Sequence, residues 1–400
     1  MSISKQRLWT KDFILITLTS FFISVMYFLI LTTITPYVIE NFNAAESKAG
    51  LAASIYVIGI LISRLIIGKY LEIIGRRKLF YIGVFLTFFA TLLYFPVDNL
   101  NILIIIRFIH GAVMGIALAV MQTTVMDLIP DERRGEGISF YTLNFILGTA
   151  IGPFLGVLIN QIANMQTIFI VCTIMTAISV VLSCFTSIPK GNITSEQLDE
   201  MKGFHFKDFF EGKALPIALL MGILALSYSG ILTFLAAYSM EINLMTAASF
   251  FFIVYSVIVL LSRPVTGRVL DSRGDNIVMY PAFILFSAGL FFLSQAGHGL
   301  TLLIGGAFIG LGFGNLQSSL QAVAIKKTPS HRIGLAVSTF FICHDVGVGI
   351  GPFLLGYLIP VIGYRNMYFT LGIIVLFCAF LYYVIHGKKA AFNKPVSSEV

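Results

Sequence analysis

The chain has 400 residues, of which 58 % are hydrophobic and only 11 % are charged, and its mean hydropathy is +0.93. Soluble domains carry about 25 % charged residues, so this composition excludes an ordinary soluble protein. The formal net charge of +7 would suit a nucleic-acid partner, but the placement of the basic residues, given below, excludes it.

Twelve apolar runs follow one another along the chain, each long enough for a membrane helix of about 20 residues. In the first half they lie at about 13–39, 50–71, 79–97, 100–127, 137–160 and 166–188. In the second half they lie at about 214–240, 246–270, 277–296, 299–325, 333–359 and 364–386. We therefore predict an all-α membrane protein with a six-helix bundle over 1–188, a linker over 189–213 and a second bundle over 214–400.

The polar segments at the start and middle of the chain allow other readings. Lys5, Arg7 and Lys11 precede the first run, as in a signal peptide, but the run exceeds the 7–15 residues of such a segment and has no small-residue cleavage site. We expect it to remain as the first membrane helix. In the linker, Thr194–Gln197 has capping-box spacing, which predicts a short amphipathic helix on the cytoplasmic surface. A plain tether is the alternative.

Basic residues are distributed very unequally between the two sides of the membrane. With both termini inside, only Lys48 and Arg365 fall on the outer side, while Arg64, Arg107 and Arg263 lie within helices. All the other Lys and Arg residues fall on the inner side. The positive-inside rule then places both termini in the cytoplasm, and the size and short loops suggest a bacterial plasma membrane.

No motif for an enzyme, a cofactor or a metal occurs in the sequence. The four cysteines fall in predicted helices without paired spacing (Cys172, Cys184, Cys343 and Cys378), so we interpret them as small buried hydrophobic residues. The chain has no GxxxxGK[ST] motif, which argues against an ATP-driven pump. We expect no cofactor, no metal and no catalytic residue.

The sequence repeats itself at an offset of 199 positions. At this offset Gly148, Gly152 and Pro153 meet Gly347, Gly351 and Pro352. The same offset pairs Arg64, Gly68, Glu72, Gly75, Gly111, Gly115 and Pro130 with Arg263, Gly267, Asp271, Gly274, Gly310, Gly314 and Pro329. One register across separate regions indicates two homologous halves, and an even number of helices in each makes them parallel repeats.

Several motifs carry a resemblance to a known family. The loop GKYLEIIGRRKL at 68–79, its weaker copy GRVLDSRGD at 267–275 and RFIHGAVMG in the fourth run resemble those of the major facilitator superfamily. The loop departs from the family pattern at Glu72 and Ile73, whereas Arg76, Arg77 and Asp127 remain available for its charge relay. The string GTAIGPFLG at 148–156 is similar to the signature of the drug:H⁺ antiporter, or efflux, branch.

The glycine string also has a physical meaning of its own. Gly148, Gly152 and Gly156 recur at every fourth position, which makes a groove that lets another helix approach closely. Pro153 removes one backbone hydrogen bond and permits a bend. We expect such a helix at an interface where two bundles rock, and a generic packing seam is the alternative.

Asp345 is the main candidate for proton coupling, and His344, Glu40 and Glu241 are further candidates. Asp345 lies about 18 Å into the eleventh run, near the membrane midplane, where apolar surroundings favour the neutral form of an acid. His344 precedes it, but successive helical residues point about 100° apart, so we do not assume a dyad; His344 shares a face with Gly347 and Gly351, which indicates packing. Glu40 and Glu241 end the first and seventh runs as gate or proton-entry groups, or as ordinary interfacial carboxylates.

A substrate cavity is predicted from polar groups within the runs. An arginine inside the membrane is costly, so Arg107 is expected to face a cavity or a partner, with snorkelling to the headgroups as the alternative. Arg64 and Arg263 are expected to brace the loop motifs. Aromatic and amide side chains suit an organic ligand, although half of them serve equally well to pair helices: Tyr27, Tyr141, Asn144, Tyr228, Tyr255, Asn315, Gln317 and Gln321.

The resemblance implies a proton-coupled exporter of small organic molecules that works by alternating access. We expect a monomer in the lipid bilayer whose partners are its substrate and protons, with no nucleic acid. One rival function is a symporter or facilitator that imports a nutrient. The other is a membrane sensor that keeps the fold without transport.

Overall fold

The computed structural model describes residues 8–130, 133–188, 210–329 and 332–388. Within these ranges the secondary structure is helical and contains no strand. Lys5, Arg7 and the capping box Thr194–Gln197 with most of the linker lie outside the described residues. Within the described helices, the side chains of Glu72 and Asp271 and the surroundings of Gly68 are not described.

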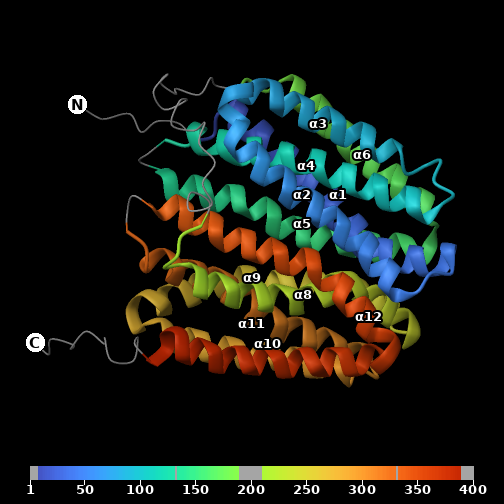
Figure 1. Cartoon of the computed structure of the whole chain (residues 1–400), viewed down its shortest axis with the longest axis vertical. Coiled ribbons are helices and arrows are strands. Elements are labelled where there is room, and N and C mark those ends of the chain that lie inside the picture. The colour runs from blue at the N-terminus through green and yellow to red at the C-terminus, as the bar shows by residue number, and fades with distance from the viewer. Residues whose placement is uncertain (1–7, 131–132, 189–209, 330–331, 389–400) are drawn as a thin grey trace, which may run out of the picture. The chain divides into compact units, whose positions relative to one another are not determined.

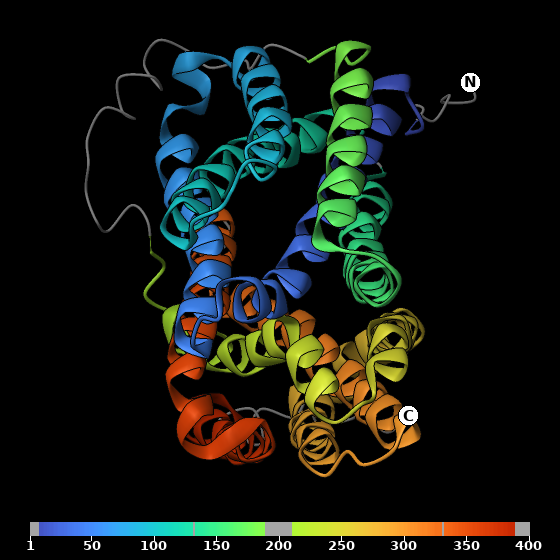
Figure 2. The same ribbon diagram turned by 90° about the vertical axis from the view of Figure 1, so that its right-hand side faces the viewer.

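The chain divides into two compact units, residues 1–204 and 205–400. The described helices of the first are α1 (Lys11–Phe42), α2 (Glu46–Ile74), α3 (Arg76–Leu92), α4 (Leu100–Leu128), α5 (Arg134–Ile162) and α6 (Met165–Cys184) (Figure 1). Those of the second are α8 (Leu215–Glu241), α9 (Met245–Arg273), α10 (Asp275–Ser294), α11 (Gly299–Lys326), α12 (Ile333–Tyr382) and the π-helical turn η4 (Tyr383–Gly387). Figure 2 shows that each unit is a bundle of long helices.

The described helices account for all twelve apolar runs. Ten described helices are long and apolar enough to span a membrane, and α3 is slightly shorter at 17 residues. The 50-residue α12 is broken at Gly363, where φ is +76°, so it contains both of the last two predicted runs. At 1.5 Å per residue its length is about two and a half times the hydrocarbon thickness.

The helix of the third apolar run ends earlier than the apolar composition predicts. The run at 79–97 predicts a helix to its end, but α3 stops at Leu92 and the chain continues in turns, with the Tyr94 amide 3.3 Å from the Thr91 carbonyl oxygen. Pro96 cannot donate a backbone hydrogen bond and disfavours helical geometry in the residue before it. As a result Tyr94 is buried in the interior of the first unit.

Equivalent helices pack together in the two units. In the first, α1 lies along α5 and α2 along α4; in the second, α8 lies along α12 and α9 along α11. The contacts agree in register: a Cβ at Gly111 would collide with the backbone oxygen of Tyr56, and one at Gly310 would lie 2.7 Å from that of Tyr255. These two tyrosines are themselves 199 positions apart.

The glycine strings are seams inside each unit. A Cβ at Gly148, Gly152 or Gly156 would meet α1 within 3 Å, while Gly347 and Gly351 pack against α8. Pro153 and Pro352 are buried within the same helices. The described contacts are therefore those of a packing seam between helices of one bundle. A role for these helices where two bundles rock stays a prediction.

Candidate substrate and proton site

The acid that the sequence places deep in the membrane is not isolated on its helix. Nδ1 of His344 lies 3.1 Å from Oδ1 of Asp345, and both side chains are mostly buried. The sequence alone provided no ground to assume a dyad, and the structure brings the two side chains into contact. Although their Cα–Cβ bonds diverge, each side chain has two rotatable bonds before its polar atoms, which lets the ring and the carboxylate meet.

A residue from α11 completes this group. Nε2 of Gln317 lies 3.5 Å from Nε2 of His344, so the imidazole contacts an amide on one side and a carboxylate on the other. Gln321 is half-buried one turn further along the same helix. Two of the residues predicted for proton coupling thus meet one predicted for the cavity, and His344 contacts polar groups instead of serving the glycine seam.

Aromatic residues of the second unit form a stack. The ring of Tyr228 lies 4.0 Å from that of Phe313 and 5.6 Å from that of Tyr255, centroid to centroid. All three side chains are buried. Helices α8, α9 and α11 therefore bring the two predicted cavity tyrosines together, and Tyr228 also stacks on Phe313, which sequence reasoning missed.

The predicted polar residues of α5 serve mainly to pair helices. The hydroxyl groups of Tyr141 and Ser20 are 3.3 Å apart, and the Asn144 amide donates to the Thr17 carbonyl oxygen at 3.4 Å. Both α5 side chains are buried against α1. Asn315 plays the same part in the second unit, where its amide donates to the Ser262 hydroxyl at 3.0 Å.

Arg107 lies in the interior of the first unit and is 0 % exposed. Its Nε donates to the backbone oxygen of Ala52 at 2.9 Å, and its guanidinium carbon lies 4.2 Å from the centre of the Tyr56 ring. A side chain with no exposed surface cannot reach the headgroups, so the snorkelling alternative was wrong. Tyr27, another predicted cavity residue, stacks on the Tyr56 ring at 5.6 Å.

Three residues around Arg107 escaped the sequence analysis. Tyr56 lies below the guanidinium, and Nδ1 of His110 is 3.1 Å from the Tyr94 hydroxyl. His110 follows Arg107 by three positions, and this spacing puts two side chains on one helix face. This spacing is the signal in the sequence that could have identified His110. Tyr94 gave none, because it falls in a run interpreted as helix.

The two loop motifs end in ion pairs. Nη1 of Arg76, at the start of α3, donates to Oδ2 of Asp127 near the end of α4, and Arg77 beside it is exposed. In the second unit Lys326 lies 3.0 Å from Asp275. Gly75 and Gly274, with φ of +98° and +92°, make the two turns, a backbone region that glycine adopts readily.

The other predicted residues occupy less distinctive places. Glu40 and Glu241 are exposed near the ends of α1 and α8, as expected of ordinary interfacial carboxylates. Arg64 and Arg263 were expected to brace the loop motifs. Arg64 has Tyr141 as an electrostatic neighbour, and Arg263 has Tyr255.

The cysteines do not all follow their prediction. Cys172, Cys343 and Cys378 are buried, but Cys184 at the end of α6 is exposed. The interpretation as buried hydrophobic residues was therefore wrong for this one position.

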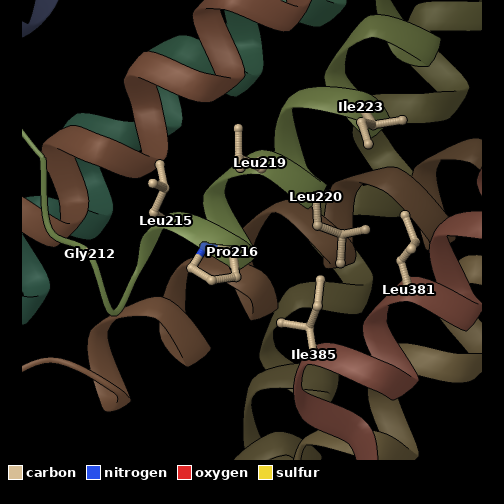
Figure 3. A pocket seen from close by; sticks show the side chains of 8 residues that line it. All are labelled: Gly212, Leu215, Pro216, Leu219, Leu220, Ile223, Leu381 and Ile385. Carbon is tan, nitrogen blue, oxygen red and sulfur yellow. The ribbon is translucent and has the colours of Figure 1, made fainter.

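An apolar hollow of about 290 Å³ lies beside α8 in the second unit (Figure 3). Aliphatic side chains dominate its lining, among them Leu215, Leu219, Leu381 and Ile385. It offers no polar side chain to orient a substrate.

Comparison with known proteins decides the family. The family model of the Major Facilitator Superfamily matches residues 16–350 and 246–399. The chain belongs to this superfamily. The predicted family and the all-α membrane fold are thereby confirmed, and the family is one of transporters and not of enzymes.

Relatives in the superfamily include proteins named for export. The staphylopine export protein of Staphylococcus aureus is 23 % identical over 87 % of this chain and 89 % of its own length. An uncharacterized MFS-type transporter of Methanocaldococcus jannaschii is 22 % identical over 82 % of this chain and 86 % of its own length. The multidrug resistance protein MdtL of Vibrio parahaemolyticus is 28 % identical over half of each chain.

Solved structures share the fold at low sequence identity. A bacterial homologue of the human lysosomal transporter Spinster has a TM-score of 0.78 at 13 % identity, with 98 % of this chain and all of the other covered. A POT family transporter in complex with 5-aminolevulinic acid also has a TM-score of 0.78, at 15 % identity, with 94 % and 96 % covered. The nucleoside transporter NupG follows at 0.72 and 13 % identity, with 96 % of this chain and all of the other covered.

Proposed function

We propose that this transporter exports a small organic molecule in exchange for protons, across a plasma membrane and with both termini in the cytoplasm. The observation that carries the proposal is the contact between His344 and Asp345 within a membrane span, with Gln317 on the far side of the imidazole. The names of several relatives favour export over import.

The chemistry of this group suits proton binding and release. An ionised carboxylate in a membrane span costs a few kcal/mol unless it is hydrated or paired, so protonation of Asp345 changes which conformation is preferred. The imidazole of His344 lies within hydrogen-bond distance of the carboxylate, so a proton can pass between the two groups. The Gln317 amide fixes the orientation of His344, as groups that contact an imidazole commonly do.

Alternating access links this group to transport. In the scheme, Asp345 is protonated when water reaches it from outside and loses the proton when water reaches it from inside. Substrate binds the ionised form and leaves when the acid is protonated. The stacked tyrosines Tyr228 and Tyr255 supply an apolar surface with polar edges, which suits a mixed organic ligand.

Two rival functions remain as alternatives, because fold neighbours include a peptide transporter and a nucleoside transporter. A symporter or facilitator would import its substrate, and a membrane sensor would bind without flux. Everted vesicles with an acidic lumen distinguish the three. With ethidium and carboxyfluorescein as probes of opposite charge, an exporter accumulates a probe in the lumen, an importer depletes it, and a sensor does neither.

The coupling assignment is tested in proteoliposomes with an imposed pH gradient. Asp345→Asn resembles the protonated form permanently, so we expect gradient-driven accumulation to fall to the level of empty liposomes while downhill exchange persists. His344→Gln should lower the rate and shift its pH profile. Asp98→Asn is the matched control, because Asp98 is an exposed acid outside the helices. Full accumulation by Asp345→Asn would overturn the assignment and turn attention to Glu40 and Glu241.

A further inference from the structure

A buried cation in the first unit has no acid to pair with. Arg107 is 0 % exposed, and among the residues that the structure describes no carboxylate forms an ion pair with it. Its Nε is satisfied by the Ala52 carbonyl oxygen, but its Nη2 has no hydrogen-bond partner. An uncompensated charge in such a place is costly, so it calls for a counter-charge.

A second buried polar atom without a hydrogen-bond partner belongs to the same cluster. The Tyr94 hydroxyl lies 3.1 Å from Nδ1 of His110. In the tautomer with the hydrogen of His110 on Nε2, Nδ1 accepts from the Tyr94 hydroxyl and Nε2 is a donor. That atom is buried and has no hydrogen-bond partner.

The remaining neighbours cannot neutralise the guanidinium. Tyr56 offers its ring face and donates its hydroxyl to the sulfur of Met114 at 2.7 Å. Cys172 is a further titratable neighbour, and Tyr27 stacks on the ring of Tyr56; a buried tyrosine or thiol is neutral at physiological pH. Cation–π attraction and one carbonyl group compensate only part of the charge.

The second unit shows that the fold does not require a cation at this place. The position 199 residues after Arg107 is Gly306, where an added Cβ would lie 3.0 Å from the ring of Phe251. His110 and Tyr94 correspond to Ile309 and Leu293. An aromatic ring and aliphatic side chains thus fill the same site, so the charged cluster is a feature of one unit and not of the packing.

We propose that Arg107 and His110 bind an anionic group, in the first instance a carboxylate of the transported molecule. Nη2 and the Nε2 hydrogen are the two donors, and an arginine–carboxylate contact is among the stronger hydrogen-bonded pairs in proteins. Tyr27, the most exposed of the cluster's aromatic side chains, stacks on Tyr56, and its displacement opens the way to the guanidinium. The substrate class rests on the proposed transport function; a free inorganic anion would use the same donors.

Ligand-dependent thermal stability of the purified full chain tests the proposal. The probes are succinate, its neutral diamide, and chloride against gluconate at constant ionic strength. We expect succinate, but not the diamide, to raise Tm, and Arg107→Gln to weaken the apparent affinity at least about tenfold. Arg107→Lys should retain part of the effect, and His110→Gln should weaken it less. Arg77→Gln is the control, because Arg77 is an exposed arginine.

Each outcome bears on the proposal. A chloride response that depends on Arg107, without one to succinate, supports the anion site and assigns it to a free ion. Equal responses of wild type and both cluster variants, or no response to any anion, overturn it. If Arg107→Gln fails to fold, His110→Gln decides. The measurement needs no proton gradient, so its failure is distinguishable from a failure of the coupling assigned to Asp345.

Discussion

In the first unit Arg76 opens α3 and pairs with Asp127 in the last turn of α4, whereas in the second unit Asp275 opens α10 and pairs with Lys326 at the end of α11. Each residue of one pair is 199 positions from its counterpart in the other. The two ion pairs therefore occupy equivalent places with their charges exchanged. The repeat preserves an ion pair between the start of one helix and the end of another. It does not preserve which of the two residues is acidic and which is basic.

The exchange of the two charges nevertheless changes how favourably each ion pair interacts with its helix dipoles. A helix N-terminus favours negative charge and a C-terminus positive charge, each by about 0.3–1 kcal/mol. Asp275 and Lys326 agree with the dipoles of their helices, and Arg76 and Asp127 oppose theirs. Asp275 is also more buried, at 13 % exposure against 46 % for Asp127. We infer that the first pair is the easier one to break and the second the more permanent tie.

Asp275 has a further contact that has no counterpart among the described residues of the first unit. Nε2 of His386 in η4 lies 2.9 Å from its second oxygen. At the equivalent position the first unit has Ser187, whose backbone amide donates to Asp12 instead. The carboxylate of the second unit thus ties three helices, and that of the first ties two.

The largest expected difference between the units concerns the glycine seams. At Gly152 an added Cβ would lie 2.7 Å from the backbone oxygen of Val25, whereas at Gly351 the nearest atom is the side-chain oxygen of Ser229. The backbone at Val25 cannot move away from an added Cβ, whereas the hydroxyl of Ser229 can rotate away from it. Gly152→Ala should therefore slow transport more than Gly351→Ala, and Gly152→Leu should reduce it at least about tenfold, since overpacking costs 1–3 kcal/mol or more.

Flux in proteoliposomes, with insertion verified by size-exclusion chromatography, measures this effect. Gly334→Leu is the control, because a Cβ at Gly334 meets nothing within 4 Å. Normal export by Gly152→Leu would show that close approach of α5 and α1 is not needed for transport.

Neutralising one acid of each ion pair gives an intermediate effect. Asp275→Asn removes a partly buried charge with two partners, so we expect it to lower Tm by an amount equivalent to about 1–3 kcal/mol. Asp127→Asn removes an exposed and dipole-opposed charge, which is worth about 0–1 kcal/mol. Thermal unfolding in detergent at low salt compares the two. Equal losses of Tm would contradict the unequal strength of the pairs.

Exchanging the charges of the first pair gives the smallest effect. The double variant Arg76→Asp with Asp127→Arg makes the first unit like the second and aligns both charges with the helix dipoles. We expect it to raise Tm slightly, by about 0.5–1 kcal/mol in equivalent terms, and to slow transport if breaking this pair is part of the cycle. The reverse exchange, Asp275→Arg with Lys326→Asp, should lower Tm. A rise in Tm with both exchanges would show that the helix dipoles do not determine the strength of these ion pairs.

The sequence by itself determined the membrane class, the number of apolar runs and the internal repeat. These properties depend on composition over windows of about 20 residues and on a constant offset, so neighbours in the fold do not alter them. The offset also predicted contacts: Gly111 meets Tyr56 as Gly310 meets Tyr255, because equal positions on equal helices face equal partners.

Only the tertiary structure decided what the polar side chains contact. His344 turns to Asp345 and Gln317, Tyr141 and Asn144 turn to α1, and Arg107 is enclosed with Tyr94 and His110. Such contacts depend on the rotation of one helix against another and on the rotamer of each side chain. A run of apolar letters carries neither, since the same hydropathy results whichever face of a helix is turned inward.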